Sequence, residues 1–133
     1  MPNNTFNLIP SEINAIGTRI VDSAIKVHKA LGPGLLESVY EECMAYELGR
    51  RNLSVERQMS VPIQYDGNTL KTPLQLDLLI HKSVIVELKS VEKMNPIFES
   101  QLMTYLRLSG LRLGYLINFN VSLVKNGIKR MVM

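Results

Sequence analysis

The chain contains 133 residues, of which 46% are hydrophobic and 20% are charged, and its formal net charge is +3. This composition is ordinary for a globular protein, so it excludes disordered, collagen-like and low-complexity chains. A single cysteine and two histidines exclude a disulfide framework and a zinc cage built from these residues. The length predicts one domain over residues 1–133, with residues 1–10 as a flexible lead. The mild basic excess permits contact with nucleic acid without arguing for it.

The chain carries no pattern typical of a membrane or secreted protein. Its first residues lack the basic region and the long apolar run of a secretory leader. Its longest apolar runs are far below the roughly 18 residues that a membrane-spanning helix needs. We therefore expect a cytoplasmic protein with no membrane partner.

Two helices are predicted first, over residues 11–31 and about 35–51. In the first, apolar residues recur at three- and four-residue steps after Ser11, which we expect to cap the helix. The run Gly32-Pro33-Gly34 separates the helices, because proline cannot continue a helix and glycine tolerates a positive φ. Asn52 is expected to end the second helix in a left-handed conformation.

From Leu53 the apolar residues alternate, which is typical of strands. Strands are predicted over residues 53–59, 61–65, 70–80 and 84–90, with turns at Asp66-Gly67-Asn68 and His81-Lys82-Ser83. These stretches place a sheet in the middle of the chain.

A third helix is predicted from Asn95-Pro96 to Gly110, followed by a strand over residues 113–119. A final hairpin is expected to turn at Asn126-Gly127, between residues 121–123 and 128–133. The order ααβββ(β)αββ predicts an α/β fold of the mixed α+β kind, with a central mixed β-sheet flanked by helices.

The two central strands carry acids inside otherwise apolar runs. If His81–Ser83 is a three-residue hairpin loop, Ile80 pairs with Val84. Counting outward from that pair places Asp77 directly opposite Glu87, where Cβ atoms are about 4.5–5.5 Å apart. Two carboxylates this close repel each other in a partly buried sheet unless a cation lies between them. The register therefore predicts a site for a hard divalent ion such as Mg²⁺, which prefers oxygen ligands.

The same count places Gln75 opposite Lys89, two residues beyond the acids. Lys89 projects from the face that carries Glu87, because side chains alternate along a strand. An ammonium group in that place is suited to steady a water nucleophile or a developing phosphoryl charge.

Each candidate also has a simpler structural interpretation. A charged pair such as Glu87 and Lys89 on one strand face is often solvated or salt-bridged. Glu37 begins the second helix, where an acid can hold its place by compensating the helix dipole alone. Gln101 and Tyr105 stand one turn apart on the third helix, which also fits an ordinary half-buried polar face.

The segment Gly34-Leu35-Leu36-Glu37-Ser38-Val39-Tyr40 resembles the naming motif of the GxxExxY proteins, a family of the PD-(D/E)XK nuclease-like superfamily. The resemblance runs from about Ile20 through Arg130. Further matching segments follow in the same order: His28 with Leu31–Gly34, then Val55–Gln58, Val86–Lys89, Gln101–Tyr105 and Leu116–Asn120.

The resemblance implies a restriction-endonuclease-like core and a set of catalytic residues: Glu37, Asp77, Glu87 and Lys89. It implies that Asp77, Glu87, Glu37 and the backbone carbonyl of Leu88 hold Mg²⁺ or Mn²⁺. It also implies that Gln101, Tyr105 and Gln75 position the substrate phosphate. At Gln75 the chain departs from the family, which usually has an arginine there, so this position supplies no charge.

The activity that the resemblance implies is metal-assisted hydrolysis of phosphodiester bonds in DNA or RNA, with Lys89 positioning the attacking water. The chain would then be a metal-dependent phosphodiesterase with nucleic acid as its partner. An oxygen-only set of ligands favours magnesium or manganese over zinc.

Two other functions stay open at this point. The first is a non-catalytic nucleic-acid-binding or regulatory and interaction module, because a nuclease-like fold does not carry activity by itself. The second is assembly into a homodimer through the apolar first helix, although packing of that helix on its own sheet is the simpler interpretation.

Overall fold

The computed structural model describes residues 8–133. Of the predicted lead over residues 1–10, residues 1–7 lie outside this described part. Ile9 is buried in the core, and the carbonyl oxygen of Leu8 accepts a hydrogen bond from Arg112 at 3.0 Å. The segment just before the first helix is therefore attached to the body of the domain.

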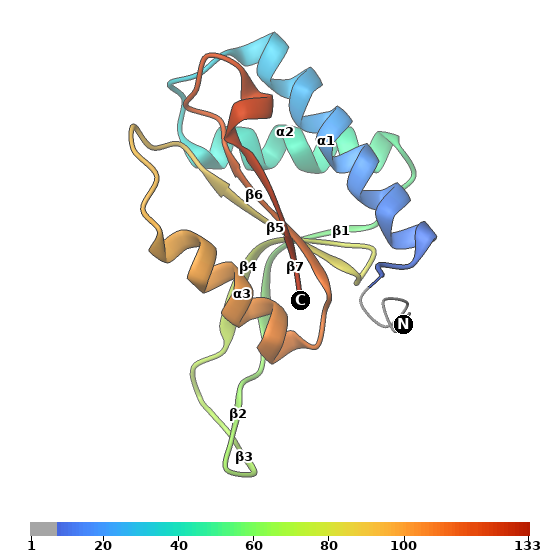
Figure 1. Cartoon of the computed structure of the whole chain (residues 1–133), viewed down its shortest axis with the longest axis vertical. Coiled ribbons are helices and arrows are strands. Elements are labelled where there is room, and N and C mark those ends of the chain that lie inside the picture. The colour runs from blue at the N-terminus through green and yellow to red at the C-terminus, as the bar shows by residue number, and fades with distance from the viewer. Residues whose placement is uncertain (1–7) are drawn as a thin grey trace, which may run out of the picture.

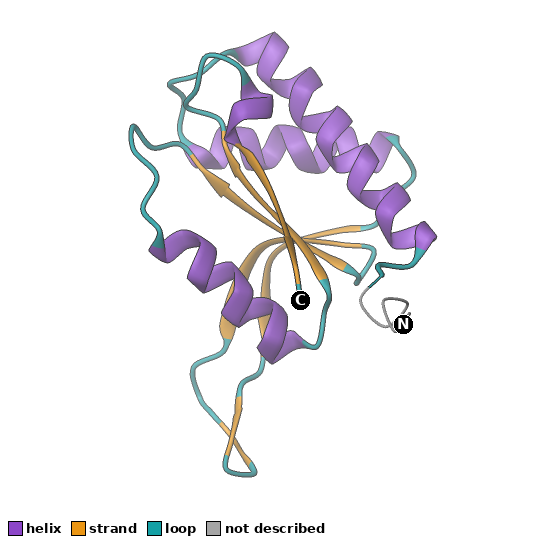
Figure 2. Cartoon of the chain, in the orientation of Figure 1, coloured by secondary structure: helices purple, strands orange, loops and turns teal. Residues whose placement is uncertain are grey.

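Helices pack on a five-stranded sheet, and a separate two-stranded ribbon extends away from the body (Figures 1 and 2). The elements of the described part are α1 (Ser11–Leu31), α2 (Glu37–Arg50), β1 (Val55–Val61), β2 (Gln64–Tyr65), β3 (Asn68–Thr69), β4 (Leu74–Ile80), β5 (Val84–Lys89), α3 (Ile97–Ser109), β6 (Leu113–Asn118), the 3-10 helix η2 (Val124–Gly127) and β7 (Ile128–Val132).

The large sheet has the order β1-β4-β5-β6-β7, and the ribbon joins β2 to β3. Neighbouring strands are antiparallel except β5 and β6, which are parallel and connected through α3. The predicted mixed sheet flanked by helices is confirmed. The element order differs from the prediction because the turn at Asp66-Gly67 is flanked by the two short strands of the ribbon.

The helices cover the two faces of the sheet unequally, with α1 and α2 on one face and α3 on the other (Figure 1). The alternation of side chains along β5 produces both cores. Val86 and Leu88 are buried with α1 and α2, whereas Ile85 is buried with Leu102 and Leu106 of α3. Almost the whole of β5 is therefore buried, and a charge on this strand lies close to a core.

The helix ends follow the predictions with one exception. Gly32, Asn52 and Gly110 have positive φ values of 71°, 63° and 76°, as expected for residues that end a helix. Ser11 does not cap α1 but is its first residue. Pro10 takes the capping position, and its carbonyl oxygen accepts from the N–H groups of Ile13 and Asn14. No helix of residues 8–133 has the length and apolar character required to cross a membrane.

The predicted hairpin at the C-terminal end is wrong in its first strand. Residues 121–123 form no strand, and β7 pairs antiparallel with β6 instead, with Ile117 opposite Ile128. The 3-10 helix η2 reverses the chain. At its end Gly127 lies so close to the carbonyl oxygen of Asn118 that an added Cβ would collide with it. The chain can therefore return along the free edge of β6, whose backbone groups need partners.

Gly17 in α1 provides a test of the packing between this helix and the sheet. A Cβ at Gly17 would collide with the hydroxyl group of Tyr115 on β6. We expect Gly17→Ala to lower the free energy of unfolding by about 1–3 kcal/mol, measured by urea denaturation, because the core must shift. The control is Gly49→Ala in α2, where nothing lies within 4 Å of an added Cβ, so alanine should leave stability unchanged or raise it. Equal effects of the two substitutions would contradict this packing.

Candidate active site

The two acids of the central strands lie where β4 and β5 separate. The pairs Ile80–Val84, Leu79–Ile85 and Leu78–Val86 confirm the predicted register. One step further, the ladder is replaced by side chains. The N–H of Asp77 donates to Glu87 Oε2 at 2.9 Å, and the N–H of Leu88 donates to Asp77 Oδ2 at 2.9 Å. Each carboxylate thus accepts an N–H of the neighbouring strand, as a backbone carbonyl of its own strand would do in a regular ladder.

The side chains of β4 exchange faces of the sheet beside the acids. Leu78 and Ile80 are buried with α1 and α2, but Leu74 and Leu76 are buried with α3. Strict alternation would keep all four on one face, so the side chains exchange faces at Asp77. The pairing of β1 with β4 also skips the residue opposite Asp77, which is Gln58, with a φ of 49°. These distortions are concentrated beside the acids, as is common at functional sites.

The predicted pairing of Gln75 with Lys89 does not form, because the two strands have already separated there. Gln75 instead pairs with Ser60 of β1, whose hydroxyl donates to it at 3.0 Å, and its amide donates to the carbonyl oxygen of Gln58 at 2.8 Å. The ammonium group of Lys89 lies 4.3 Å from the centre of the Phe98 ring.

The carboxylates are difficult to ionise together. Burial, followed by the charge of Asp77, raises the pKa of Glu87 to about 8, and only 5% of Glu87 is exposed. Burial also raises the pKa of Asp77. Burial and the charges of both acids raise the pKa of Tyr105, so its phenol belongs to the same electrostatic environment. A proton or a cation is therefore needed to balance the pair near neutral pH.

Two residues near Asp77, Glu41 and Gln58, were not predicted as site residues from the sequence. Glu41 of α2 accepts a hydrogen bond from Gln58 at 2.6 Å and forms an ion pair with Arg57 at 3.0 Å. The amide of Gln58 also lies 3.5 Å from Asp77 Oδ1. Glu41 could have been found, because it lies four residues after Glu37 and so on the same helix face.

Tyr40 fastens the beginning of α2 to the loop that precedes it and to the residue that follows β6. Its hydroxyl donates to the carbonyl oxygen of Gly32 at 2.6 Å and accepts from the N–H of Leu35 at 3.1 Å. Its ring stacks on Phe119 with centroids 4.4 Å apart. The hydroxyl of Ser90 donates to the carbonyl oxygen of Leu35 at 2.6 Å. Tyr40, the last residue of the Gly34–Tyr40 motif, thus holds the loop that leads to Glu37.

Asn118 holds the chain just after Lys89. Its side chain accepts from the N–H of Val91 at 3.1 Å and donates to the carbonyl oxygen of Val91 at 3.0 Å, and it also accepts from the N–H of Asn120. The N–H of Phe119 donates to the carbonyl oxygen of Lys89 at 3.0 Å. Asn118 is only 2% exposed, so these bonds define where β5 ends.

The structure brings the predicted residues together only in part. Asp77, Glu87 and Tyr105 share one environment, and the charge of Glu37 contributes to the raised pKa of Glu87. Glu37 and Gln101 are exposed. Among residues 8–133, no three acids, histidines or cysteines are grouped closely enough to hold a metal ion.

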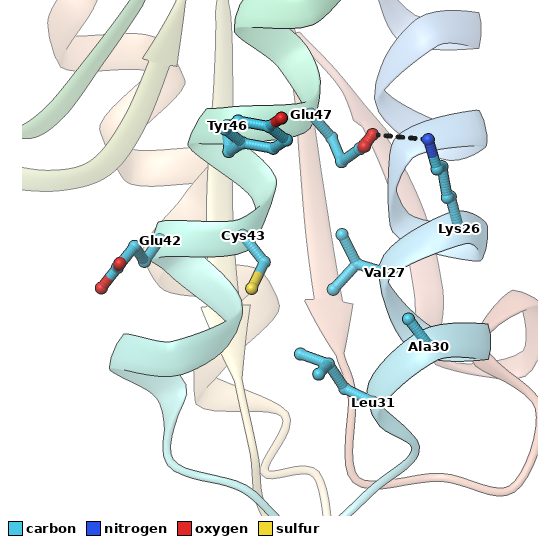
Figure 3. A pocket seen from close by; sticks show the side chains of 8 residues that line it. All are labelled: Lys26, Val27, Ala30, Leu31, Glu42, Cys43, Tyr46 and Glu47. Atoms are coloured by element: carbon cyan, nitrogen blue, oxygen red, sulfur yellow. Dashed lines mark ion pairs between the residues drawn. The ribbon is translucent and has the colours of Figure 1, made fainter.

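A separate groove of about 320 Å³ lies between α1 and α2 (Figure 3). Its lining comprises Lys26, Val27, Ala30, Leu31, Glu42, Cys43, Tyr46 and Glu47, and none of these is a predicted site residue. Lys26 and Glu47 form an ion pair across it at 3.1 Å. Cys43 is half-buried in this groove. The groove is distinct from the acid pair.

Comparison with known families assigns the chain. The family model described as the PD-(D/E)XK nuclease superfamily matches residues 14–131, so the chain belongs to this superfamily. Its mixed sheet with flanking helices is accordingly a restriction-endonuclease-like fold, as predicted. The narrower assignment to the GxxExxY family stays a prediction. No curated protein and no solved structure matches the chain.

Tyr40→Phe tests the fastening of α2. The substitution keeps the stacked ring but leaves the carbonyl oxygen of Gly32 and the N–H of Leu35 without their partner. We expect the free energy of unfolding, measured in urea, to fall by about 1–3 kcal/mol. The control is Tyr46→Phe on the same helix, where the side chain is 65% exposed and the change should have little effect. A Tyr40→Phe variant as stable as this control would contradict the role of the hydroxyl.

The raised pKa of Glu87 makes stability depend on pH. Between its ordinary value of 4.5 and about 8, the folded chain keeps a proton that the unfolded chain has lost. The contribution of Glu87 to stability is therefore complete below pH 4.5 and is lost as the pH rises to about 8. We expect Glu87→Gln to reduce the fall in unfolding free energy over this range, measured by denaturation without divalent cations. Glu42→Gln, at an exposed position, should keep the wild-type slope, and the same slope in Glu87→Gln would contradict the raised pKa.

Proposed function

We propose that this chain is a nuclease that depends on Mg²⁺ or Mn²⁺ and hydrolyses phosphodiester bonds in DNA or RNA. The observation that carries the proposal is the pair of Asp77 and Glu87, which lie side by side at the point where two strands separate. Glu87 is buried and Asp77 is half-buried, and burial raises the pKa of both. A carboxylate pair in this position lowers stability unless it is balanced by a positive ion, so a binding role accounts for it.

The residues present fit a hard divalent cation. Each acid uses one oxygen to accept a backbone N–H, which leaves Asp77 Oδ1 and Glu87 Oε1 outside those bonds. Together with the carbonyl oxygen of Leu88, these are the ligand types that Mg²⁺ and Mn²⁺ prefer. When bound, such an ion supplies a water of lowered pKa and stabilises negative charge on the leaving oxygen.

We assign Lys89, Tyr105 and Gln101 to contact with the attacking water and the substrate phosphate. Lys89 lies at the end of the strand that carries Glu87, where its charge can orient the attacking water and the scissile phosphate. Tyr105 of α3 lies within reach of the charges of both acids, and we assign its hydroxyl to donate to a phosphate oxygen. Gln101 stands one turn earlier on the exposed surface of α3 and extends this contact.

Residues on the opposite side of the acid pair complete the site. Glu37 adds negative charge from the beginning of α2, and we assign it to orienting or sharing the cation. Gln58 of β1 donates to Asp77, and Glu41 of α2 accepts from the same amide group of Gln58. Gln75 contributes a neutral hydrogen-bonding group where a charged contact is more usual, so we assign it to weak phosphate contact.

Cleavage assays with the purified chain test the proposal. We expect cleavage of single-stranded DNA, duplex DNA or RNA in the presence of Mg²⁺ or Mn²⁺, and none with a chelator. Asp77→Asn and Glu87→Gln should each lower the rate at least about 100-fold, because each removes a negative charge that holds the cation. Glu42→Gln removes an exposed acid from the groove between α1 and α2, and it should cleave at the wild-type rate.

A different outcome would favour the non-catalytic alternative. The uncharged Gln75, which stands where the family usually has an arginine, is the observation that supports this alternative. If no substrate is cut, while wild type and Asp77→Asn bind nucleic acid equally with or without cations, the chain is a binding module on a nuclease-like fold. The salt dependence of that binding would then count the phosphate contacts.

A further inference from the structure

Lys89 rests on an aromatic ring although two acids lie close by. Its ammonium group is 4.3 Å from the centre of the Phe98 ring, a distance typical of a cation–π interaction. Within residues 8–133 it forms no ion pair with Asp77 or Glu87. Yet both acids feel its charge, because Lys89 lowers the pKa of each.

The position of the Lys89 ammonium on the Phe98 ring, rather than in an ion pair with the acids, needs a physical explanation. Lysine has a long flexible stem, and an ammonium beside two half-buried carboxylates gains from closing an ion pair with them. Such an ion pair would cover the oxygens that are free of backbone hydrogen bonds, Asp77 Oδ1 and Glu87 Oε1. The face of the Phe98 ring offers the ammonium a competing place that carries no full charge.

The ring is well anchored. Phe98 lies in the first turn of α3, where its N–H donates to the carbonyl oxygen of Asn95 at 3.0 Å. The side chain of Asn95 accepts from the N–H of Ile97 at 3.0 Å, which fixes the start of the helix. The Phe98 ring packs against the core under α3. The place that it offers Lys89 is therefore set by the helix rather than by the substrate.

We propose that Phe98 is a positioning residue that holds Lys89 away from Asp77 and Glu87, which keeps the free oxygens of the acids open to a divalent cation. The inference rests on the proposed metal site and extends it to a residue outside the acid–lysine set. When a phosphate enters, its negative charge outweighs the attraction of the ring, and the flexible stem lets Lys89 turn toward it.

Titration with Mn²⁺ measured by calorimetry tests the proposal in a cycle of variants. In Phe98→Leu the space stays apolar but the ring is lost, so Lys89 closes on the acids and Mn²⁺ affinity falls about five- to tenfold. Phe98→Tyr keeps a ring face and should bind as wild type does. In the background of Lys89→Met, Phe98→Leu should cause no further loss, because no ammonium is left to compete.

A second measurement needs no metal. Stacking under the ring should shift the Cε protons of Lys89 upfield in the NMR spectrum of the wild type, and the shift should vanish in Phe98→Leu. Thermal unfolding of each variant shows whether it is folded. If Phe98→Leu binds Mn²⁺ as wild type does, or if the upfield shift is absent from the wild type, the inference about Phe98 is refuted while the proposed nuclease stands. A folded wild-type chain that binds no cation refutes the proposed function and this role of Phe98 with it.

Discussion

The structure depends on one exchange of hydrogen bonds, in which the carboxylates of Asp77 and Glu87 accept the backbone N–H groups of each other's strand. A carbonyl at either position would continue the ladder and keep β4 and β5 together. Carboxylates end the ladder instead, so the strands separate, and Leu74 and Leu76, which precede Asp77 in β4, lie on the face of α3. The same exchange places two acids where burial raises the pKa of each, so a proton or a cation is needed to balance the pair near neutral pH. The architecture and the chemistry of the site thus have one physical origin.

Much of the surrounding domain serves to keep the two ends of this site in place. Tyr40 and Phe119 stack between α2 and β6, and Asn118 fastens the segment that follows Lys89. These residues never reach the acids, yet they determine where Glu37 and Lys89 stand. A sequence motif can therefore combine a residue of the site with residues that only support it. In the Gly34–Tyr40 motif, the glutamate is the member exposed beside the acids, while the tyrosine is fully buried.

The parts of the site that could be predicted are those governed by local rules. A three-residue hairpin loop fixes the register of its own strands, so the neighbourhood of Asp77 and Glu87 followed from counting. The predicted pairing of Gln75 with Lys89 was wrong, because Asp77 and Glu87 interrupt the ladder before it reaches these residues. The residue Gln58 was not assigned a role for a similar reason: its left-handed φ of 49° in the middle of a strand has no local cause in the sequence.

By itself the sequence determined the fold class, the order of the main helices and strands, the register of the central hairpin and the membership in the PD-(D/E)XK nuclease superfamily. These depend on periodicity, turn residues and motif spacing, which are properties of neighbouring residues. The tertiary structure alone decided that Gln58 stands beside Asp77, that β7 returns to β6, and that Lys89 rests on Phe98. These contacts join distant segments through space, and only the packing of helices on both faces of a bent sheet brings them together.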